Sequence, residues 1–183
     1  MKVRRGASKL YKQPDGATES AEQAKEVAKR ELVGPRHSGR LLGEILIEQA
    51  AATPEEIEAA RTRQNSCDDR LGEILIEHGV CDEHRISAAI AQQYDLKVVD
   101  LRRFTPEQAA IHQLGGDVAR THRVLPLRVT ETGVIVVLDD VPSSETLATL
   151  STHLGGNVGI LLAPPSELTR SLETSYRALD NMS

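Results

Sequence analysis

Apolar positions recur at helical spacing in two neighbouring segments of the chain. Residues 42–64 read LGEILIEQAAATPEEIEAARTRQ, and residues 71–93 read LGEILIEHGVCDEHRISAAIAQQ. In each segment a leucine is followed three and four positions later by an isoleucine and a leucine, which predicts a short amphipathic helix. A second helix follows in each, with Thr53 and Asp82 as the expected N-cap residues. The pattern therefore predicts two tandem helical hairpins.

The two segments are copies of one another at a fixed offset. Seven consecutive residues, LGEILIE, are identical and begin at Leu42 and at Leu71, so the offset is 71 − 42 = 29 positions. Further along, Ile57 matches Ile86 and each copy ends in a glutamine. Because neither hairpin can bury its apolar face alone, we expect the four helices to share one core.

Beyond the repeat the pattern changes to short apolar runs that alternate with helical segments. We expect strands at 96–101, 124–129, 134–138 and 158–162, and helices at 105–113, 117–121, 144–154 and 165–178. The predicted fold class is α+β. A four-helix subdomain at 39–93 precedes a small α/β subdomain at 94–183 with a three- to four-stranded, mixed or antiparallel sheet. Residues 1–38 are predicted to be a polar, disordered tail, in which 20–32 form a transient helix.

Composition and charge narrow the classes of partner. Aromatic residues make up 2% of the chain, and the net charge is −5. These values argue against stacking on single-stranded nucleic acid and against general polyanion binding, so no nucleic-acid partner is expected. A small anionic ligand remains compatible, because it needs only a few well-placed arginines. The two cysteines form no CxxC pair, no signal peptide is recognisable and no apolar run of spanning length occurs, which predicts a cytoplasmic protein without a membrane span.

Motifs of catalysis are absent from the sequence. It contains no phosphate-binding GxxxxGK[ST] loop, no GxGxxG, HExxH or GxSxG, and no calcium-binding loop, so we expect no enzyme activity and no cofactor. One group of residues has metal-ligand chemistry: Cys67, His78, Cys81 and His84. The matching positions of the first copy do not carry these residues, which favours coincidence over a zinc site.

The tripeptide Arg70-Leu71-Gly72 is the strongest candidate for binding chemistry. It places a guanidinium, an apolar side chain and a glycine at the start of a helix, where an anion can meet free backbone N–H groups. Arginine binds phosphate or the O6/N7 edge of guanine in bidentate fashion. An equally good interpretation is a helical hairpin in which the glycine is a packing contact and the arginine a surface charge.

The paired motif resembles the MshEN domain, the N-terminal domain of type II secretion and type IV pilus ATPases that is also found on some glycosyltransferases. That family carries two 24-residue motifs, RLGxx-apolar-apolar-xxGxxxxxxLxxALxxQ, separated by five residues. Here the copies are 41–64 and 70–93, with residues 65–69 between them. HRVLPL at 122–127 also resembles the family's α/β half, and the resemblance extends over about 39–178.

The resemblance implies that the chain binds cyclic di-GMP, a bacterial second messenger. The ligand residues implied in the second copy are Arg70, Leu71, Gly72, Leu75, Ile76, Gly79 and Gln93. Those implied in the first copy are Leu42, Gly43, Leu46, Ile47 and Gln64, and Asp140 is implied from the second subdomain.

The first copy departs from the motif at three places. Leu41 stands at the arginine position, although Arg40 precedes it and is a candidate substitute. Ala50 stands where the second copy has Gly79, and Ala60-Arg61 replaces the Ala-Leu pair.

We therefore expect a regulatory module that binds cyclic di-GMP and acts on an ATPase or glycosyltransferase effector, as a C-terminal domain or protein partner at a membrane complex. Two alternatives stay open: a protein-docking module without a nucleotide, and a binder of another nucleotide such as ATP.

Overall fold

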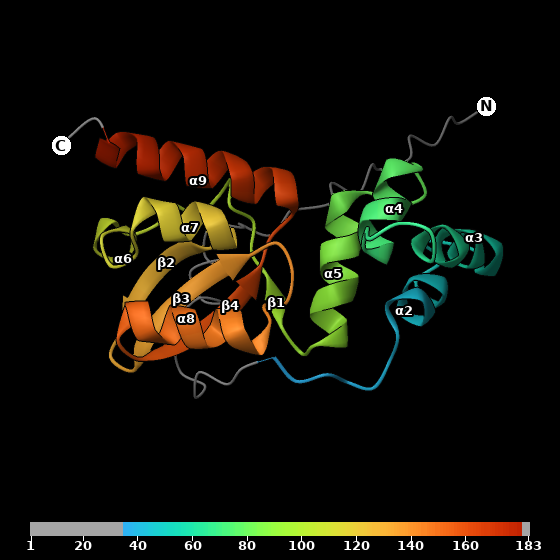
Figure 1. Ribbon diagram of the computed structural model, residues 1–183, viewed down its shortest axis with the longest axis horizontal. Coiled ribbons are helices and arrows are strands. Elements are labelled where there is room, and N and C mark those ends of the chain that lie inside the picture. The colour runs from blue at the N-terminus through green and yellow to red at the C-terminus, as the bar shows by residue number, and fades with distance from the viewer. Residues whose placement is uncertain (1–34, 181–183) are drawn as a thin grey trace, which may run out of the picture.

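The structure is a computed structural model, and it describes residues 35–180, with side chains described as far as Arg177. A helical subdomain and an α/β subdomain lie side by side, and a short connection after α5 joins them (Figure 1). Each subdomain has its own cluster of buried apolar side chains, and Ile90 packs against both clusters.

The helical subdomain consists of α2 (Leu42–Glu48), α3 (Pro54–Gln64), α4 (Leu71–Glu77) and α5 (Glu83–Gln93), so the prediction of two short-long helix pairs is confirmed. Both expected N-caps are present. The Thr53 hydroxyl accepts a hydrogen bond from the Glu56 N–H at 3.2 Å, and the Asp82 carboxylate accepts one from the Arg85 N–H at 2.8 Å. These contacts satisfy N–H groups that a helix start leaves unpaired.

The two copies share one core, as expected, and they interlock. Helix α2 packs mainly against α5, and α3 packs mainly against α4, so the closest packing lies between copies and not within one hairpin. The buried side chains of this core come from both copies and include Ile45, Leu46, Ile57, Ile74, Leu75 and Ile86. A single hairpin therefore exposes its apolar face unless the other copy covers it.

The α/β subdomain is built on a mixed four-stranded sheet. Its elements are β1 (Lys97–Val98), α6 (Gln108–Ile111), α7 (Gly116–His122), β2 (Leu125–Thr130), β3 (Gly133–Leu138), α8 (Ser144–Leu154), β4 (Asn157–Leu162) and α9 (Pro165–Asp180). The strand order is β1-β4-β3-β2, with β4 parallel to β1 and β3, and β2 antiparallel to β3. Val134 to Leu138 of β3 are all buried in the centre of this core. The predicted α+β fold class is confirmed.

The strand expected at 96–101 is much shorter than predicted. It pairs with β4 only at Lys97 and Val98, and the Val99 N–H adds one bond to the Leu162 carbonyl at 2.8 Å. The chain then turns, because the Asp100 carboxylate accepts hydrogen bonds from both the backbone and the guanidinium of Arg102. The hydrogen bond from Arg102 also lowers the pKa of the Asp100 carboxyl. A side chain that bonds the backbone two residues later ends a strand.

The helix expected at 105–113 is reduced to α6. The capping pattern at Thr105-Pro106 predicts an earlier start, but the helix begins after Glu107. The Glu107 carboxylate accepts a bond from the Arg128 Nε at 2.7 Å, and the Glu107 N–H donates to the Leu127 carbonyl at 2.9 Å. Contacts with β2 therefore hold this segment extended, against its local helix signal.

Residues 36–38 are predicted to belong to the polar tail, but they pack against the end of α5. The Arg36 N–H donates to the Tyr94 carbonyl at 3.1 Å, and the Ser38 N–H donates to the Gln93 carbonyl at 2.7 Å. The rings of His37 and Tyr94 meet edge to face at 4.9 Å. The transient helix predicted at 20–32 lies outside the described residues. Within residues 35–180, no helix has the length and apolar character needed to span a membrane.

Candidate functional site

A pocket of about 160 Å³ lies where the two subdomains meet. Its walls come from α2, α4 and α5 on one side and from the chain after β3 and the first residue of α9 on the other. Seven of the residues that the sequence assigns to ligand binding line this pocket: Leu42, Arg70, Leu71, Gly72, Ile76, Gln93 and Asp140. The structure thus brings together most of the site predicted for the second copy and adds the residue predicted from the second subdomain.

Arg70 and Asp140 join across the subdomain boundary at this pocket. Arg70 immediately precedes the first residue of α4, and its backbone is extended. Its guanidinium forms an ion pair with the Asp140 carboxylate. The other Asp140 oxygen accepts the Val141 N–H at 2.7 Å, so both oxygens have partners. The Arg70 side chain is still 65% exposed, which leaves other guanidinium donors open to a ligand.

A second cavity of about 420 Å³ adjoins the first at this ion pair. The two cavities share Arg70, Glu73, Asp139 and Asp140, and the second continues past Arg123 to the start of α8. Asp139 is held there by the Arg123 Nε at 2.5 Å. Arg70 therefore faces both cavities and can bind a ligand that extends from one to the other.

The two motif glutamines make reciprocal contacts between the copies. The Gln93 amide donates to the Arg40 carbonyl at 2.9 Å, just before the first copy, and the Gln64 amide donates to the Asp69 carbonyl at 3.2 Å, just before the second. Each glutamine thus fixes the chain that leads into the other copy. Both glutamines were predicted to bind the ligand. Gln93 lines the first cavity, whereas Gln64 lies outside both cavities.

Several predicted ligand residues belong to the packing beneath the surface. Leu46 and Leu75 are fully buried in the helical core, so neither side chain can touch a ligand in this structure. Gly43 and Gly72 are buried where helices cross: a Cβ on either would lie 2.8 Å from the Cγ2 of Ile57 or Ile86. This contact supports the alternative interpretation, in which the glycine is there for packing.

The remaining predicted residues lie outside the pocket. Arg40 binds Glu48 at 2.5 Å, at the other end of α2. Leu41 and Ile47 are the exposed large hydrophobic residues of the described chain, at 49% and 37% exposure. Gly79 follows α4 in the left-handed conformation with φ +68°, and nothing lies within 4 Å of the position of a Cβ there. Its role in the structure is therefore to end a helix.

The start of α4 offers less to an anion than the sequence suggests. The Glu73 carboxylate accepts the Arg70 N–H at 3.0 Å, and Glu44 accepts the Leu41 N–H at 2.9 Å in the first copy. The N-terminal end of each of these seven-residue helices is thus already occupied by a carboxylate of the helix itself. The Arg70 side chain, and not the helix end, is the group available for a negative charge.

Sequence reasoning missed the residues that close the pocket from the second subdomain. Asp139 and Pro165 line it together with Tyr94, which follows the repeat. Asp139 stands next to the predicted Asp140, so the acidic pair after a strand was the available signal. Nothing in the local pattern marks Pro165, because only the tertiary fold brings the start of α9 to α4.

The four residues considered as a zinc site have separate partners. The thiols of Cys67 and Cys81 donate to the carbonyls of Arg63 and Ala51, each at 3.3 Å. His78 contacts the Ile74 carbonyl at 2.9 Å, and His84 lies 3.1 Å from Glu167. Among the described residues no group of three or more His, Cys, Asp or Glu side chains is placed to hold a metal ion.

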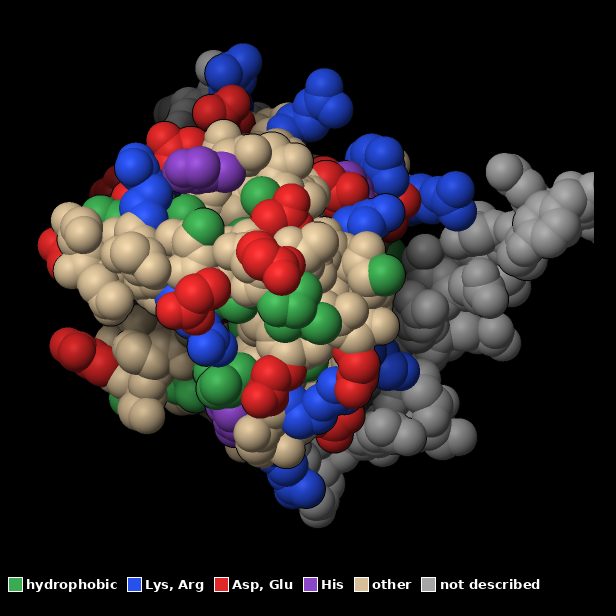
Figure 2. All heavy atoms as spheres, turned by 90° about the vertical axis from the view of Figure 1, so that its right-hand side faces the viewer, with side chains coloured by type: hydrophobic (Ala, Val, Ile, Leu, Met, Phe, Trp, Pro, Cys, Tyr) green, Lys and Arg blue, Asp and Glu red, His purple; other side chains and the backbone are tan. Residues whose placement is uncertain are grey.

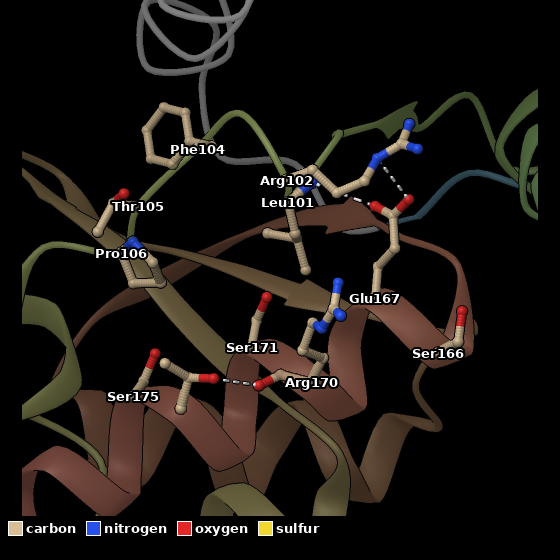
Figure 3. A pocket seen from close by; sticks show the side chains of 11 residues that line it. Leu101, Arg102, Phe104, Thr105, Pro106, Ser166, Glu167, Arg170, Ser171 and Ser175 are labelled. Atoms are coloured by element: carbon tan, nitrogen blue, oxygen red, sulfur yellow. Dashed lines mark hydrogen bonds and ion pairs between the residues drawn. The ribbon is translucent and has the colours of Figure 1, made fainter.

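A larger cavity of about 730 Å³ lies along α9, between that helix and the segment 101–106 (Figure 3). None of the predicted site residues lines it. Its acidic side chain, Glu167, is occupied by the Arg102 Nε at 3.2 Å and by the Leu101 N–H at 3.3 Å. Size alone therefore does not make it the better candidate, and the pocket at Arg70 remains the candidate site.

The helical end of the molecule presents charges of both signs. Figure 2 shows acidic and basic side chains distributed around small apolar patches on this face. No single-sign surface of the kind that binds a polyanion is visible there, in keeping with the net charge of −5.

Comparisons with known proteins point to one domain family. The sequence profile of the MshEN domain matches residues 94–182. A solved structure of MshE with cdg, that is cyclic di-GMP, is similar with 25% sequence identity and a TM-score of 0.68, covering 75% of this chain and 99% of that chain. The N-terminal domain of XpsE has the same fold, with 17% identity, a TM-score of 0.61, and coverage of 77% of this chain and 97% of that one. A search of curated proteins gave no match.

The two kinds of comparison cover different parts of the chain. The sequence profile begins at Tyr94, just after the repeat, whereas a structural match over 75% of the chain must also include much of the helical subdomain. The profile match and the structural match agree: residues 94–182 match the MshEN family model, and the fold resembles that of MshE.

Proposed function

We propose that this chain is a regulatory module that binds cyclic di-GMP at the pocket between its subdomains. The observation that carries the proposal is the convergence of Arg70, Gln93 and Asp140 with apolar side chains of both repeat copies at one pocket. The similarity to MshE, whose structure was solved with cyclic di-GMP, supports the same ligand.

The chemistry of the pocket suits a guanine nucleotide. The Arg70 guanidinium provides paired donors for a phosphate or for the O6/N7 edge of guanine. Leu42, Leu71 and Ile76 offer apolar surface for the face of a base, in a chain that has few aromatic residues for stacking. The pocket's 160 Å³ is smaller than the roughly 300–1,000 Å³ of typical small-molecule sites. A whole dinucleotide must therefore extend over neighbouring surface.

An MshEN domain is a binding domain and not a catalytic one, so a regulated activity belongs to a partner or to another domain. We propose that this effector is an ATPase of a secretion or pilus system, or a glycosyltransferase. Cyclic di-GMP would act on it by stabilising one arrangement of the pocket that joins the two subdomains.

Calorimetric titration with cyclic di-GMP tests the proposal directly. We expect binding by the wild-type chain and an affinity about 10- to 100-fold lower for Arg70→Ala, because a charge-assisted hydrogen bond contributes roughly 1.5–3 kcal/mol. Arg63→Ala is the matched control, since Arg63 is an exposed arginine of α3 outside both cavities. Absence of binding heat from folded protein at micromolar concentration would reject the proposal.

Competition experiments separate cyclic di-GMP from other nucleotides. Excess ATP or GTP should leave the labelled cyclic di-GMP complex intact. Displacement by ATP at a similar concentration would instead favour the alternative in which the fold binds a mononucleotide.

A further inference from the structure

The first repeat copy has a surface equivalent to the pocket wall of the second. The offset of 29 residues relates Arg70 to Leu41, Gly72 to Gly43 and Gln93 to Gln64. The α/β subdomain closes the second-copy surface through Asp139, Asp140 and Pro165. On the first-copy surface, Leu41 and Ile47 are the exposed large hydrophobic side chains of the described chain.

Arg61 occupies the place on this surface that an isoleucine fills in the other copy. The repeat offset relates Arg61 to Ile90, which lines the pocket beside Arg70 and Gly72. The Nη2 of Arg61 lies 3.6 Å from the point where a Cβ on Gly43 would be, so the guanidinium lies over that glycine. The first-copy surface therefore has a cation, which comes from Arg61 of α3 and not from position 41, the residue before α2.

The Arg61 guanidinium is also available. Among the described residues it makes no ion pair or side-chain hydrogen bond, and the residue is half-buried. Arg40, the substitute expected from the sequence, is instead engaged at both ends: its guanidinium binds Glu48 and its carbonyl accepts the Gln93 amide. Arg61 is thus better placed than Arg40 to meet a ligand above Gly43.

The family resemblance already implies ligand contacts from the first repeat copy, and we propose that Arg61 is the cationic group of that copy, which meets one guanine–phosphate half of cyclic di-GMP. The inference rests on the proposed function and specifies it, because the ligand has two chemically identical halves and the protein two related surfaces. Leu41 and Ile47 supply apolar cover for the base, as Ile76 does in the other copy. Arg61 supplies the charge that Leu41 lacks at the motif's arginine position.

A purely structural role for Arg61 is the competing explanation. A cation in the last turn of α3 favours the helix through its dipole, and Arg63 lies in the same turn. Both arginines share that role, whereas only Arg61 lies over Gly43. A comparison of the two therefore separates ligand binding from helix stabilisation.

The experiment is calorimetric titration of cyclic di-GMP into the full chain carrying Arg61→Ala, Arg63→Ala, or Leu41→Arg together with Arg61→Ala. We expect affinity to fall at least tenfold for Arg61→Ala, to stay within twofold for Arg63→Ala, and to recover in the double variant. Recovery would follow because Leu41→Arg restores the arginine at its position in the motif. Thermal unfolding of each variant checks that the fold is intact.

The outcomes distinguish this inference from the function on which it rests. If Arg70→Ala weakens binding but Arg61→Ala does not, the ligand binds at the subdomain pocket and the inference about Arg61 is overturned. Equal losses for Arg61→Ala and Arg63→Ala, without recovery by Leu41→Arg, would likewise reject it in favour of a structural role. Absence of binding by the wild-type chain would overturn both proposals together.

Discussion

Ala50 and Gly79 end the first helix of each repeat copy in the same left-handed backbone conformation, with φ +52° and φ +68°. Glycine adopts this conformation freely, whereas for a residue with a Cβ it is less favourable by about 1 kcal/mol. We expect Ala50→Gly to raise the free energy of unfolding by up to about 1 kcal/mol and Gly79→Ala to lower it by a similar amount. Urea denaturation of both variants measures the two changes.

These two substitutions also test why the motif has a glycine at this place. Nothing lies within 4 Å of the Cβ position of Gly79, so the cost of Gly79→Ala comes from the backbone alone. If Gly79→Ala weakens cyclic di-GMP binding while stability is unchanged, the glycine serves the ligand and not the helix end.

Tyr176 of α9 is a buried tyrosine whose phenol has a raised pKa. Its ring is 2% exposed and its hydroxyl donates to the Leu114 carbonyl at 3.0 Å. Burial raises the pKa of Tyr176 to about 12 from an ordinary value of 10, although nearby Arg120 acts in the opposite direction. The neutral phenol therefore stabilises the fold below pH 10, and this contribution is lost as the pH rises from 10 to 12.

We expect the wild-type chain to lose roughly 2 kcal/mol more stability than Tyr176→Phe between pH 10 and pH 12, since each unit of pKa shift corresponds to about 1.4 kcal/mol. The measurement is urea denaturation of both proteins across this pH range. At pH 7 the variant should be only about 1 kcal/mol less stable, the contribution of one hydrogen bond. Parallel alkaline profiles for the two proteins would contradict the assignment.

Single residues of the site were predictable from the sequence where they match the family's motif. Arg70 and Gln93 stand at fixed places in that motif, and both line the pocket. Leu46 and Leu75 belong to the same motif but are core residues. The repeated spacing of apolar residues identifies the helix, and only packing decides which of its apolar side chains face inward.

At the scale of elements, each glycine at a helix crossing fixes how closely the two helices of one copy approach. A Cβ on Gly43 would lie 2.8 Å from the Ile57 Cγ2, and on Gly72 the same distance from the Ile86 Cγ2. We expect Gly43→Ala to lower the free energy of unfolding by about 1–3 kcal/mol, as overpacking does. Ile57→Leu moves the branch away from the β-carbon, so the double variant should recover part of the loss.

A thermodynamic cycle over Gly43→Ala, Ile57→Leu and their combination measures this contact by denaturation. Coupling between contacting residues should make the double variant more stable than the sum of the single changes predicts. Strict additivity would show that the helices move apart without repacking around Ile57.

Elements with strong local signals were predictable, and those decided by distant contacts were not. Thr53 and Asp82 cap their helices as expected. The segment at Thr105-Pro106 has a similar start signal, yet its helix begins later because Glu107 bonds to β2 and Arg128. The order of the strands likewise depends on parallel pairing between β3 and β4, which no local pattern determines.

At the scale of the whole molecule, the ion pair between Arg70 and Asp140 connects the two subdomains at the candidate site. Both Asp140 oxygens have protein partners, so we expect Asp140 to act on a ligand chiefly by positioning Arg70. The pair is partly exposed, and such pairs contribute about 0.2–1 kcal/mol. Asp140→Ala should therefore weaken cyclic di-GMP binding by up to about fivefold, less than Arg70→Ala does.

A double-mutant cycle tests whether Asp140 acts through Arg70. If it does, Asp140→Ala has no further effect on affinity once Arg70 is already alanine. An additional loss in that background would mean that Asp140 contacts the ligand itself, as the family resemblance implies. Tighter binding by Asp140→Ala alone would mean that the ion pair withholds Arg70 from the ligand, and a ligand would then have to separate the subdomains at this point in order to bind.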